Sequence, residues 1–322
     1  MLWLAWRQHR LQFLAVAAVL AALAVYLIHI TLPMVGPTRL YQTCVTLDTD
    51  AACEPWNEIW SRFVGERSDL TQVIALANVL PGLAGAFWGA PLIAREFERG
   101  THRLAWTQGV TRLRWLTVKL VVLACAAVLG GTAQAVLMTW VADNWRINQT
   151  INRFNDRILF DAVGVVPPAL WLFSVALGTA VGLVIRRTTA AMAVTLAALA
   201  LVLIGLNFAR PHYATPATRV PVYGQEGRDM YRITEEWRQG YLIRDRDGKA
   251  ISSWEANALC PAMTGADEAV RDCLIGQGGQ MLERYQPADR FARFQWTENG
   301  ILLAGTVLIG GLTIGRLRRR AD

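Results

Sequence analysis

The chain has 322 residues, of which 53% are hydrophobic and 18% are charged, and its formal net charge is +7. The apolar residues gather in runs of about twenty, which is long enough to cross the ~30 Å hydrocarbon core of a membrane as helices. This distribution excludes an ordinary soluble core and predicts an all-α protein that crosses the membrane several times.

Six apolar runs are expected to be transmembrane helices. Their approximate limits are 12–32, 71–94, 116–139, 164–185, 190–208 and 299–315. The first run follows a basic segment but is longer than the ~7–15 apolar residues of a signal peptide, so we expect it to remain as a span. The runs divide the chain into a membrane domain over 1–208, an extracellular domain over 209–297, and a last helix with a basic tail over 298–322.

The basic residues are divided unevenly between the two sides of the predicted membrane. Six spans place both termini on one side, together with segment 95–119 and Arg186–Arg187. That side holds 14 of the 32 Lys and Arg residues but only 3 of the 25 Asp and Glu residues. The positive-inside rule therefore predicts that this side is cytoplasmic. The sequence shows no clustered basic face, so nucleic-acid binding is not expected.

The cysteines fit this orientation. Four of the five lie in segments predicted to be outside the cell, Cys44 and Cys53 in the first and Cys260 and Cys273 in the last. We expect two disulfides, Cys44–Cys53 and Cys260–Cys273, with free thiols as the alternative. Neither pair has CxxC spacing, so a metal site is not expected.

Two further elements are predicted in the outer segments. Segment 33–70 is expected to be a loop that carries a short amphipathic helix near 55–67. Segment 244–254, RDRDGKAISSW, is expected to be a hairpin with Asp247–Gly248 at its turn.

The apolar runs contain few of the ionisable or catalytic residues that an ion-driven transporter or an enzyme would need. None contains Asp or Glu, and Lys119 and His29 lie near span ends, where we interpret them as interfacial anchors. The sequence has no Walker A, HExxH or GxSxG motif. An intramembrane protease that uses Ser174 and His29 is left as an alternative.

A few polar and aromatic residues inside the spans are candidates to line a pathway for an amphiphilic substrate. They are Asn78, Phe87, Trp88, Asn207 and Phe208. The alternative interpretation is that the polar positions serve packing between helices.

The segment 95–115, REFERGTHRLAWTQGVTRLRW, places five arginines between two apolar runs. Gly100 is a natural helix end and Thr101 a natural N-cap, so we predict a helix, a turn, a short helix, a second turn and a helix. Such an elbow would present the short helix, with Trp106, to a protein partner. An ordinary positive-inside loop is the alternative.

Four stretches of the sequence resemble ABC-2-type transporter permeases, most closely an actinobacterial subgroup. They are LAWRQHR (4–10), GAFWGAPLIAREFERGTHRLAWTQGVTRLRWL (85–116), RRTTAAMAVTL (186–196) and the final RLRRR. The resemblance implies the membrane subunit of an exporter in the plasma membrane, paired with a second copy of itself or with a similar permease. A pair of ABC ATPase subunits on separate chains would hold ATP and Mg, so this chain would bind no cofactor and would not be an enzyme.

The same resemblance assigns coupling with the ATPase to the loop 95–108. Glu98, Gly100 and Thr101 match the E-x-G-T core of the family pattern, Arg95 and Glu96 match the charges before it, and Arg103, Leu104 and Trp106 fall on the short coupling helix. We expect Glu98, Thr101 and Arg103 to make polar contacts with the ATPase and Trp106 to be its apolar anchor.

One feature departs from the resemblance. Segment 209–297 is longer than the external link of many family members. An alternative function is therefore a membrane-anchored sensor or immunity protein whose extracellular domain binds a ligand.

Overall fold

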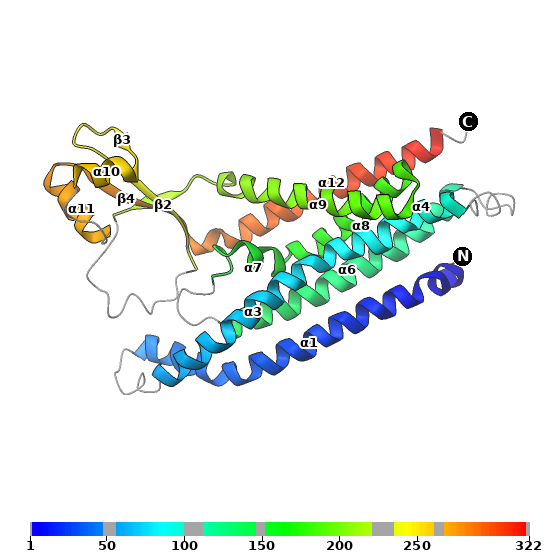
Figure 1. Ribbon diagram of the computed structural model, residues 1–322, viewed down its shortest axis with the longest axis horizontal. Helices are drawn as coiled ribbons and strands as arrows, with labels where there is room; N and C mark the ends of the chain where they lie inside the picture. Colours follow the sequence, from blue (N-terminus) through cyan, green and yellow to red (C-terminus); the bar gives the residue numbers. More distant parts are fainter. Residues whose placement is uncertain are drawn as a thin grey trace.

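The computed structural model describes residues 2–47, 56–99, 112–145, 152–220, 235–260 and 267–319. Long helices form a bundle, and a small sheet lies beyond one end of it (Figure 1). Both termini lie at the other end, beside the end of α4 (Ala90–Arg99) and the start of α6 (Arg112–Asn144) (Figure 1). We call these two ends the sheet end and the terminal end.

Among the described residues, six helical segments are long and apolar enough to cross a membrane, and each corresponds to one predicted run. They are Leu14–Arg39, Leu70–Glu98, Thr117–Asn144, Val166–Ile185, Thr188–His212 and Ala288–Arg316. The elements that carry them are α1 (Leu2–Leu47), α3 (Trp56–Ala84) with the π-helix η1 (Gly85–Gly89) and α4, then α6, α8 (Val166–Ile185), α9 (Thr188–Ala209) with η3 (Arg210–His212), and η6 (Ala288–Arg290) with α12 (Phe291–Arg319). The chain is therefore a mostly helical polytopic membrane protein.

The helices at the sheet end are longer than the apolar runs indicate. The prediction of a loop over 33–70 was wrong, because α1 continues to Leu47 and α3 begins at Trp56. The short helix predicted near 55–67 is the first part of α3. α1 passes through Pro33 and Pro37, which usually end or kink a helix, so these residues did not mark its end. Each helical residue beyond an apolar run adds a further backbone hydrogen bond.

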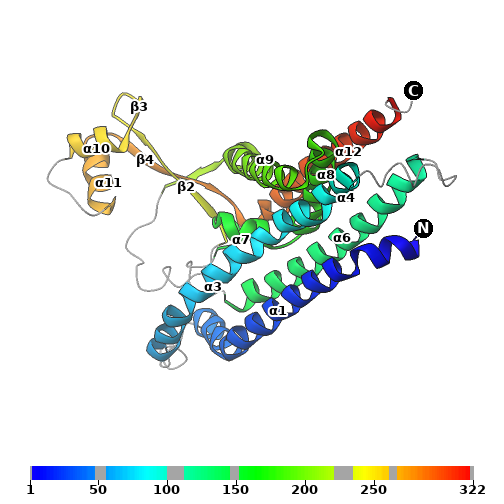
Figure 2. The same cartoon turned by 45° about the vertical axis from the view of Figure 1, so that its right-hand side comes forward.

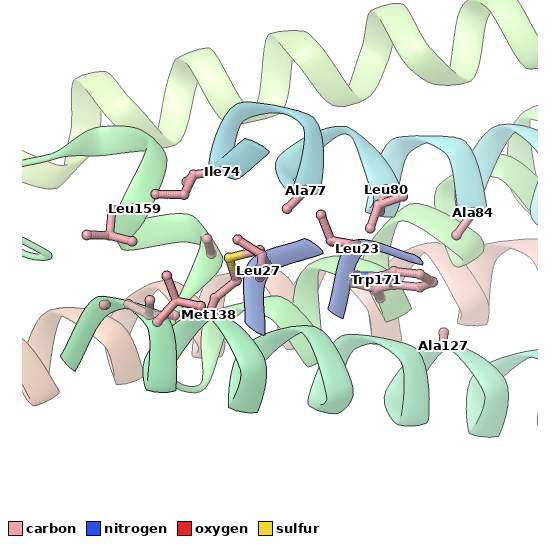
Figure 3. Packing of buried hydrophobic residues seen from close by; sticks show 14 of the residues in the cluster. Leu23, Leu27, Ile74, Ala77, Leu80, Ala84, Ala127, Met138, Leu159 and Trp171 are labelled. Atoms are coloured by element: carbon pink, nitrogen blue, oxygen red, sulfur yellow. The ribbon is translucent and has the colours of Figure 1, made fainter. Parts of the chain in front are cut away.

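The centre of the bundle is α8, which packs against α3, η1, α4, α6, α9 and α12. A buried apolar cluster joins α8 to the helices around it. Its side chains come from α1 (Leu23, Leu27), α3 (Ile74, Ala77, Leu80, Ala84), α6 (Ala127, Met138), α7 (Leu159; α7 is Arg157–Ala162) and α8 (Trp171) (Figure 3). Gly130 of α6 leaves room for the Trp171 ring, because a Cβ atom added there would lie 3.0 Å from it.

Glycines bring η1 and α4 into backbone contact with α8. A Cβ atom on Gly85 would lie 2.5 Å from the Ser174 carbonyl oxygen, and one on Gly89 would lie 2.5 Å from the Val175 carbonyl oxygen. On the α8 side, a Cβ on Gly178 would collide with the carbonyl oxygen of Gly85. Such close approach is the usual role of small residues between membrane helices.

A four-stranded antiparallel sheet follows α9, which the prediction of an all-α fold did not include. Its strands are β1 (Ala217–Arg219), β2 (Trp237–Arg244), β3 (Ala250–Ile251) and β4 (Gln280–Gln286), in the order β1-β4-β2-β3. The predicted hairpin is confirmed: β2 pairs with β3, and Gly248 takes φ +78° in the turn. Two helices, α10 (Ser253–Leu259) and α11 (Asp267–Gly276), complete this part of the chain.

The sheet is joined firmly to the helices. Figure 2 shows β2 leading from the sheet toward α7, and β4 leading into α12. Phe154 packs against Trp237 of β2 and Phe294 of α12, with ring centroids 5.7 and 5.0 Å apart. The Arg153 guanidinium donates to Glu235 at 2.8 Å, and the Asn152 amide donates to the Glu236 carbonyl at 2.8 Å.

The glycine contacts generate a stability prediction. Gly178→Ala should lower the free energy of unfolding by ~1–3 kcal/mol, because its Cβ would push the α8 backbone away from η1. Gly205→Ala on α9 is the matched control, since nothing lies within 4 Å of the Cβ that it adds. Thermal unfolding of both variants in detergent measures the difference, and equal stability would contradict the contact.

Candidate functional site

The last turn of α4 is tied to three other parts of the bundle at the terminal end. Lys119 of α6 forms an ion pair with Glu96, and the Lys119 side chain is buried. The Arg186 guanidinium lies over the Phe97 ring, 5.1 Å from its centroid. Glu98 accepts hydrogen bonds from the first residue of α9, Thr188. Lys119, interpreted from the sequence as an interfacial anchor, is therefore paired with an acid at this end of the bundle.

Glu98, which lies on α4, caps the N-terminus of α9. Its Oε2 atom accepts from the Thr188 hydroxyl at 2.6 Å and from the Thr188 backbone N–H at 3.3 Å. The residue before α9, Arg187, has an extended backbone and provides no side-chain cap of its own. A carboxylate suits a helix N-terminus because it satisfies an unpaired N–H group and interacts favourably with the helix dipole.

The turn between α8 and α9 consists of Arg186 and Arg187. Arg186 has φ +58° and ψ 9°, a left-handed conformation, and its N–H closes α8 by donating to the Gly182 carbonyl. An L-residue other than Gly takes this conformation at a cost of roughly 1 kcal/mol. Phe97 and Glu98 thus contact the two sides of this turn. Phe97 contacts Arg186, and Glu98 contacts Thr188. We call these two contacts the α4 latch.

A buried charge cluster lies at the sheet end. Arg210 of η3 is 2% exposed, and its guanidinium donates to both carboxylate oxygens of Glu298 at 3.0 and 2.8 Å. It also donates to Asp161 of α7 at 2.5 Å, and it lies 3.9 Å from the centroid of the Phe160 ring. One cation therefore holds together α7, the end of α9 and α12.

The charge cluster contains two carboxylates for one guanidinium, and the second carboxylate contributes to a raised pKa of Asp161. Burial, together with the negative charge of Glu298, raises the pKa of Asp161 to about 7, although Arg210 opposes the shift. Burial and Glu298 also raise the pKa of Tyr213, whose hydroxyl lies 3.5 Å from Glu298. Asp161 therefore changes charge near neutral pH.

An apolar groove of about 690 Å³ opens on the side of the bundle between α6, α8 and α12. The residues around it are Val128, Thr132, Ala135, Val136, Thr139, Trp140 and Asp143 of α6, Gly164, Val165, Pro168, Ala169 and Leu172 at and before the start of α8, and Asn299 and Leu303 of α12. The groove occupies the half of these helices nearer the sheet end. None of the predicted pathway residues lines it.

Comparison with protein families identifies the chain. Residues 16–210 match the family described as ABC-2 membrane transporter related, which covers more than half of the chain. The protein belongs to this family. No curated protein and no solved structure matches the chain.

Membership of the ABC-2 family makes the chain a membrane component of a transport system and a multi-pass protein of the plasma membrane. The matched region ends at Arg210, so it contains both halves of the α4 latch and the cation of the charge cluster. The sheet and α12 lie beyond it.

The predicted coupling residues of this ABC-2 protein divide into two groups. Arg95, Glu96 and Glu98 lie on α4, where Glu96 and Glu98 bond within the chain. The other five lie outside the described residues, and they are Gly100, Thr101, Arg103, Leu104 and Trp106.

The predicted pathway residues differ in their surroundings. Trp88 is buried against Trp171, with ring centroids 6.0 Å apart, and the Asn78 amide donates to the Ile158 carbonyl at 2.8 Å. Phe87 and Phe208 are 51% and 76% exposed on η1 and α9, and Asn207 is half-buried.

The structure also bears on the predicted disulfides and on the protease alternative. Cys260 and Cys273 form a disulfide, as predicted. Cys53 lies outside the described residues, so the Cys44–Cys53 disulfide stays a prediction. Ser174 is buried and donates to the Leu170 carbonyl of its own helix, while His29 is exposed on α1.

Sequence reasoning missed the charge cluster. Arg210 comes just after the fifth predicted run and Glu298 just before the sixth, where charged residues are common. Nothing in the sequence pairs these two residues with each other or with Asp161.

The first prediction from this site concerns the buried cation. Arg210→Met should lower the free energy of unfolding by ~3–5 kcal/mol, because it leaves the Glu298 carboxylate buried without its partner. Arg238→Met is the control, since Arg238 pairs with Glu283 at 3.1 Å but is half-exposed, and its loss should cost less than ~1 kcal/mol. Chemical unfolding followed by tryptophan fluorescence compares the two, and similar losses would contradict the difference.

The second prediction concerns pH. Because the pKa of Asp161 is raised from 3.8 to about 7, the folded chain holds a proton that the unfolded chain releases between these values. The contribution of Asp161 to stability is therefore full below pH 4 and is lost as the pH rises through 7. The side chain of Asp161→Asn stays neutral. As the pH rises from 5 to 8, its melting temperature should therefore rise relative to that of the wild type. A fall in the melting temperature of Asp161→Asn relative to the wild type would mean that the attraction of Arg210 for the Asp161 carboxylate outweighs the cost of burying it.

Proposed function

We propose that this chain is the permease subunit of an ATP-driven ABC-2-type exporter. Two permease subunits, either two copies of this chain or this chain and a similar one, would form the translocation pathway. Two ABC ATPase subunits on separate chains would bind ATP and Mg and would drive transport. The chain itself would then carry no catalytic site and no cofactor.

The observation that supports this proposal is the position of the last turn of α4, where the charged segment 95–115 begins. Within the matched ABC-2 region, this turn lies at the end of the bundle where both termini lie, and its side chains contact α6 and the α8–α9 turn. A partner that moved this segment would act directly on three transmembrane helices. A loop with no other role than membrane orientation would not need such ties.

The positive-inside rule places this terminal end in the cytoplasm, where an ATPase would bind. Thr101 and Arg103 would make polar contacts with the ATPase, Leu104 would pack beside them, and Trp106 would be the apolar anchor. An aromatic anchor surrounded by polar contacts is the usual arrangement of a strong protein interface.

The exposed aromatic residues are consistent with a pathway between two subunits. Phe87 and Phe208 lie on the second and fifth spans, where Phe87 is half-exposed and Phe208 is exposed. In a dimer, a second subunit would cover these faces, and Asn78, Trp88 and Asn207 would lie on the same two spans. The pathway would then accept an amphiphilic substrate.

The family match favours this transport function over the alternative of a membrane-anchored sensor. The two functions also differ in one requirement. A sensor would work without any ATPase, whereas a permease subunit would need one.

The test is recovery of the ATPase with the tagged chain from gently solubilised membranes of its own host. We expect an ABC ATPase to be recovered, and Trp106→Ala to reduce its recovery by roughly 10-fold or more, because the loss of an aromatic anchor costs ~2 kcal/mol. Quantitative mass spectrometry of the eluate measures the ratio of ATPase to permease.

The matched control is Trp254→Ala. Trp254 is 82% exposed on α10, at the sheet end, where a cytoplasmic ATPase would not reach it. Recovery of the wild-type chain without any ATPase, in amounts that neither variant changes, would overturn the proposed function in favour of the sensor.

A further inference from the structure

We infer that Glu98 is a positioning residue that transmits movement of the charged segment to α9 through Thr188, and that it does not contact the ATPase. The inference rests on the proposed function, because it concerns how an ATPase partner would act on the membrane helices. It assigns to Glu98 a role inside the chain.

The carboxylate of Glu98 is already engaged. It accepts two hydrogen bonds from Thr188, one from the hydroxyl at 2.6 Å and one from the backbone N–H at the start of α9 at 3.3 Å. A carboxylate that satisfies a helix N-terminus loses that stabilisation if it turns toward another protein. Contact with the ATPase would therefore compete with the cap.

The contacts near the turn hold α4 and η1 more closely to α8 than they hold α9. Backbone contacts at Gly89 and Gly182 hold η1 and α4 against α8 without intervening side chains. In contrast, α9 follows α8 after the two-residue turn that contains the left-handed Arg186, and it packs on α4 through the small side chains of Ala90, Ala94 and Ala191. Rotation about that turn would change the direction of α9 while α8 stayed in place.

The α4 latch controls this turn from outside. Phe97 contacts Arg186 on the α8 side of the turn, and Glu98 caps Thr188 on the α9 side. These two residues are consecutive on the last turn of α4, within the charged segment 95–115, and they precede the predicted coupling helix in the chain. A pull on that segment therefore reaches the start of α9 through the Glu98 carboxylate.

The residues around Thr188 provide variants that separate this role from others. Thr188→Val removes the hydroxyl donor at nearly constant volume, and Thr188→Ser retains it. Thr189→Val makes the same change at the next residue, which is exposed. Glu98→Gln removes the negative charge and keeps the shape of the side chain.

The experiment uses the complete complex with an environment-sensitive fluorophore on Ala190→Cys, an exposed position on α9, in a Cys125→Ser background. In the wild type, addition of ATP should shift the emission. Glu98→Gln and Thr188→Val should both reduce that shift by roughly 3- to 10-fold, the range expected for loss of one hydrogen bond that is exposed to solvent. Thr188→Ser and Thr189→Val should retain it, and all four variants should recover as much ATPase as the wild type.

Two outcomes would overturn the inference. If Glu98→Gln lost the ATPase, as Trp106→Ala is expected to, while Thr188→Val retained it, Glu98 would be a direct contact of the ATPase. If Thr188→Val retained the full emission shift, the cap would have no part in transmission. A purely structural role is excluded by normal recovery together with a reduced shift.

A second measurement keeps this inference separate from the proposed function. If no ATPase is recovered with the wild type, spin labels on Val121→Cys of α6 and Ala190→Cys of α9 report the arrangement of the isolated chain. Loss of the cap in Glu98→Gln or Thr188→Val should broaden the distance distribution, whereas Thr189→Val should not. An unchanged distribution would refute the positioning role even though the proposed function had already failed.

Discussion

The contact of α8 with η1 and α4 is the constraint on which the rest of the membrane domain depends. In lipid, apolar side chains gain little by leaving the hydrocarbon for a helix interface, so association relies on close packing and hydrogen bonds. Glycines at 85, 89, 178 and 182 allow the two backbones to touch. A close backbone contact forms only in one register, and this register sets how far α4 extends beyond α8 at the terminal end. The position of Phe97 and Glu98 at the α8–α9 turn is a consequence of it.

The two ends of the bundle are held by polar contacts of very different strength. At the sheet end, Arg210 and Glu298 are buried, and breaking such a pair leaves an uncompensated charge that costs ~3–5 kcal/mol. At the terminal end, the bonds between Glu98 and Thr188 are exposed to solvent, where the net value of a hydrogen bond is ~1 kcal/mol. The same helix, α9, therefore has one end held by a buried ion pair and one end held by exposed hydrogen bonds and by the packing of Ala191 on Ala90 and Ala94. If α9 moves as we infer, Arg210 would be its fixed point.

The sequence predicted the fold of the membrane domain well, because the length of an apolar run is set by the thickness of the bilayer. It did not predict where α1 ends or where α3 begins, since Pro33, Gly36 and Pro37 indicated the end of the first helix and α1 passes through all three. The hairpin at Asp247–Gly248 was predictable from its turn residues, but its pairing with β4 was not, because that pairing joins residues far apart in the chain. The same limit applies to the site. The motif around Glu98 was recognisable, yet its partner Thr188 became evident only when the packing of α8 brought the two together.

The sheet takes part in the same mechanical unit as the helices. Phe154, Phe160, Trp237 and Phe294 form one aromatic cluster that joins α7, β2 and α12, and Arg210 lies directly against the Phe160 ring. The Gln286 amide of β4 adds a hydrogen bond to the Ala214 carbonyl, just after η3, at 2.8 Å. If α9 pivots about Arg210, its displacement at the sheet end is small, and the sheet keeps its contacts with α7 and α12. Movement that begins at α4 is then largest at the terminal end and within the bundle, and it decreases toward the sheet.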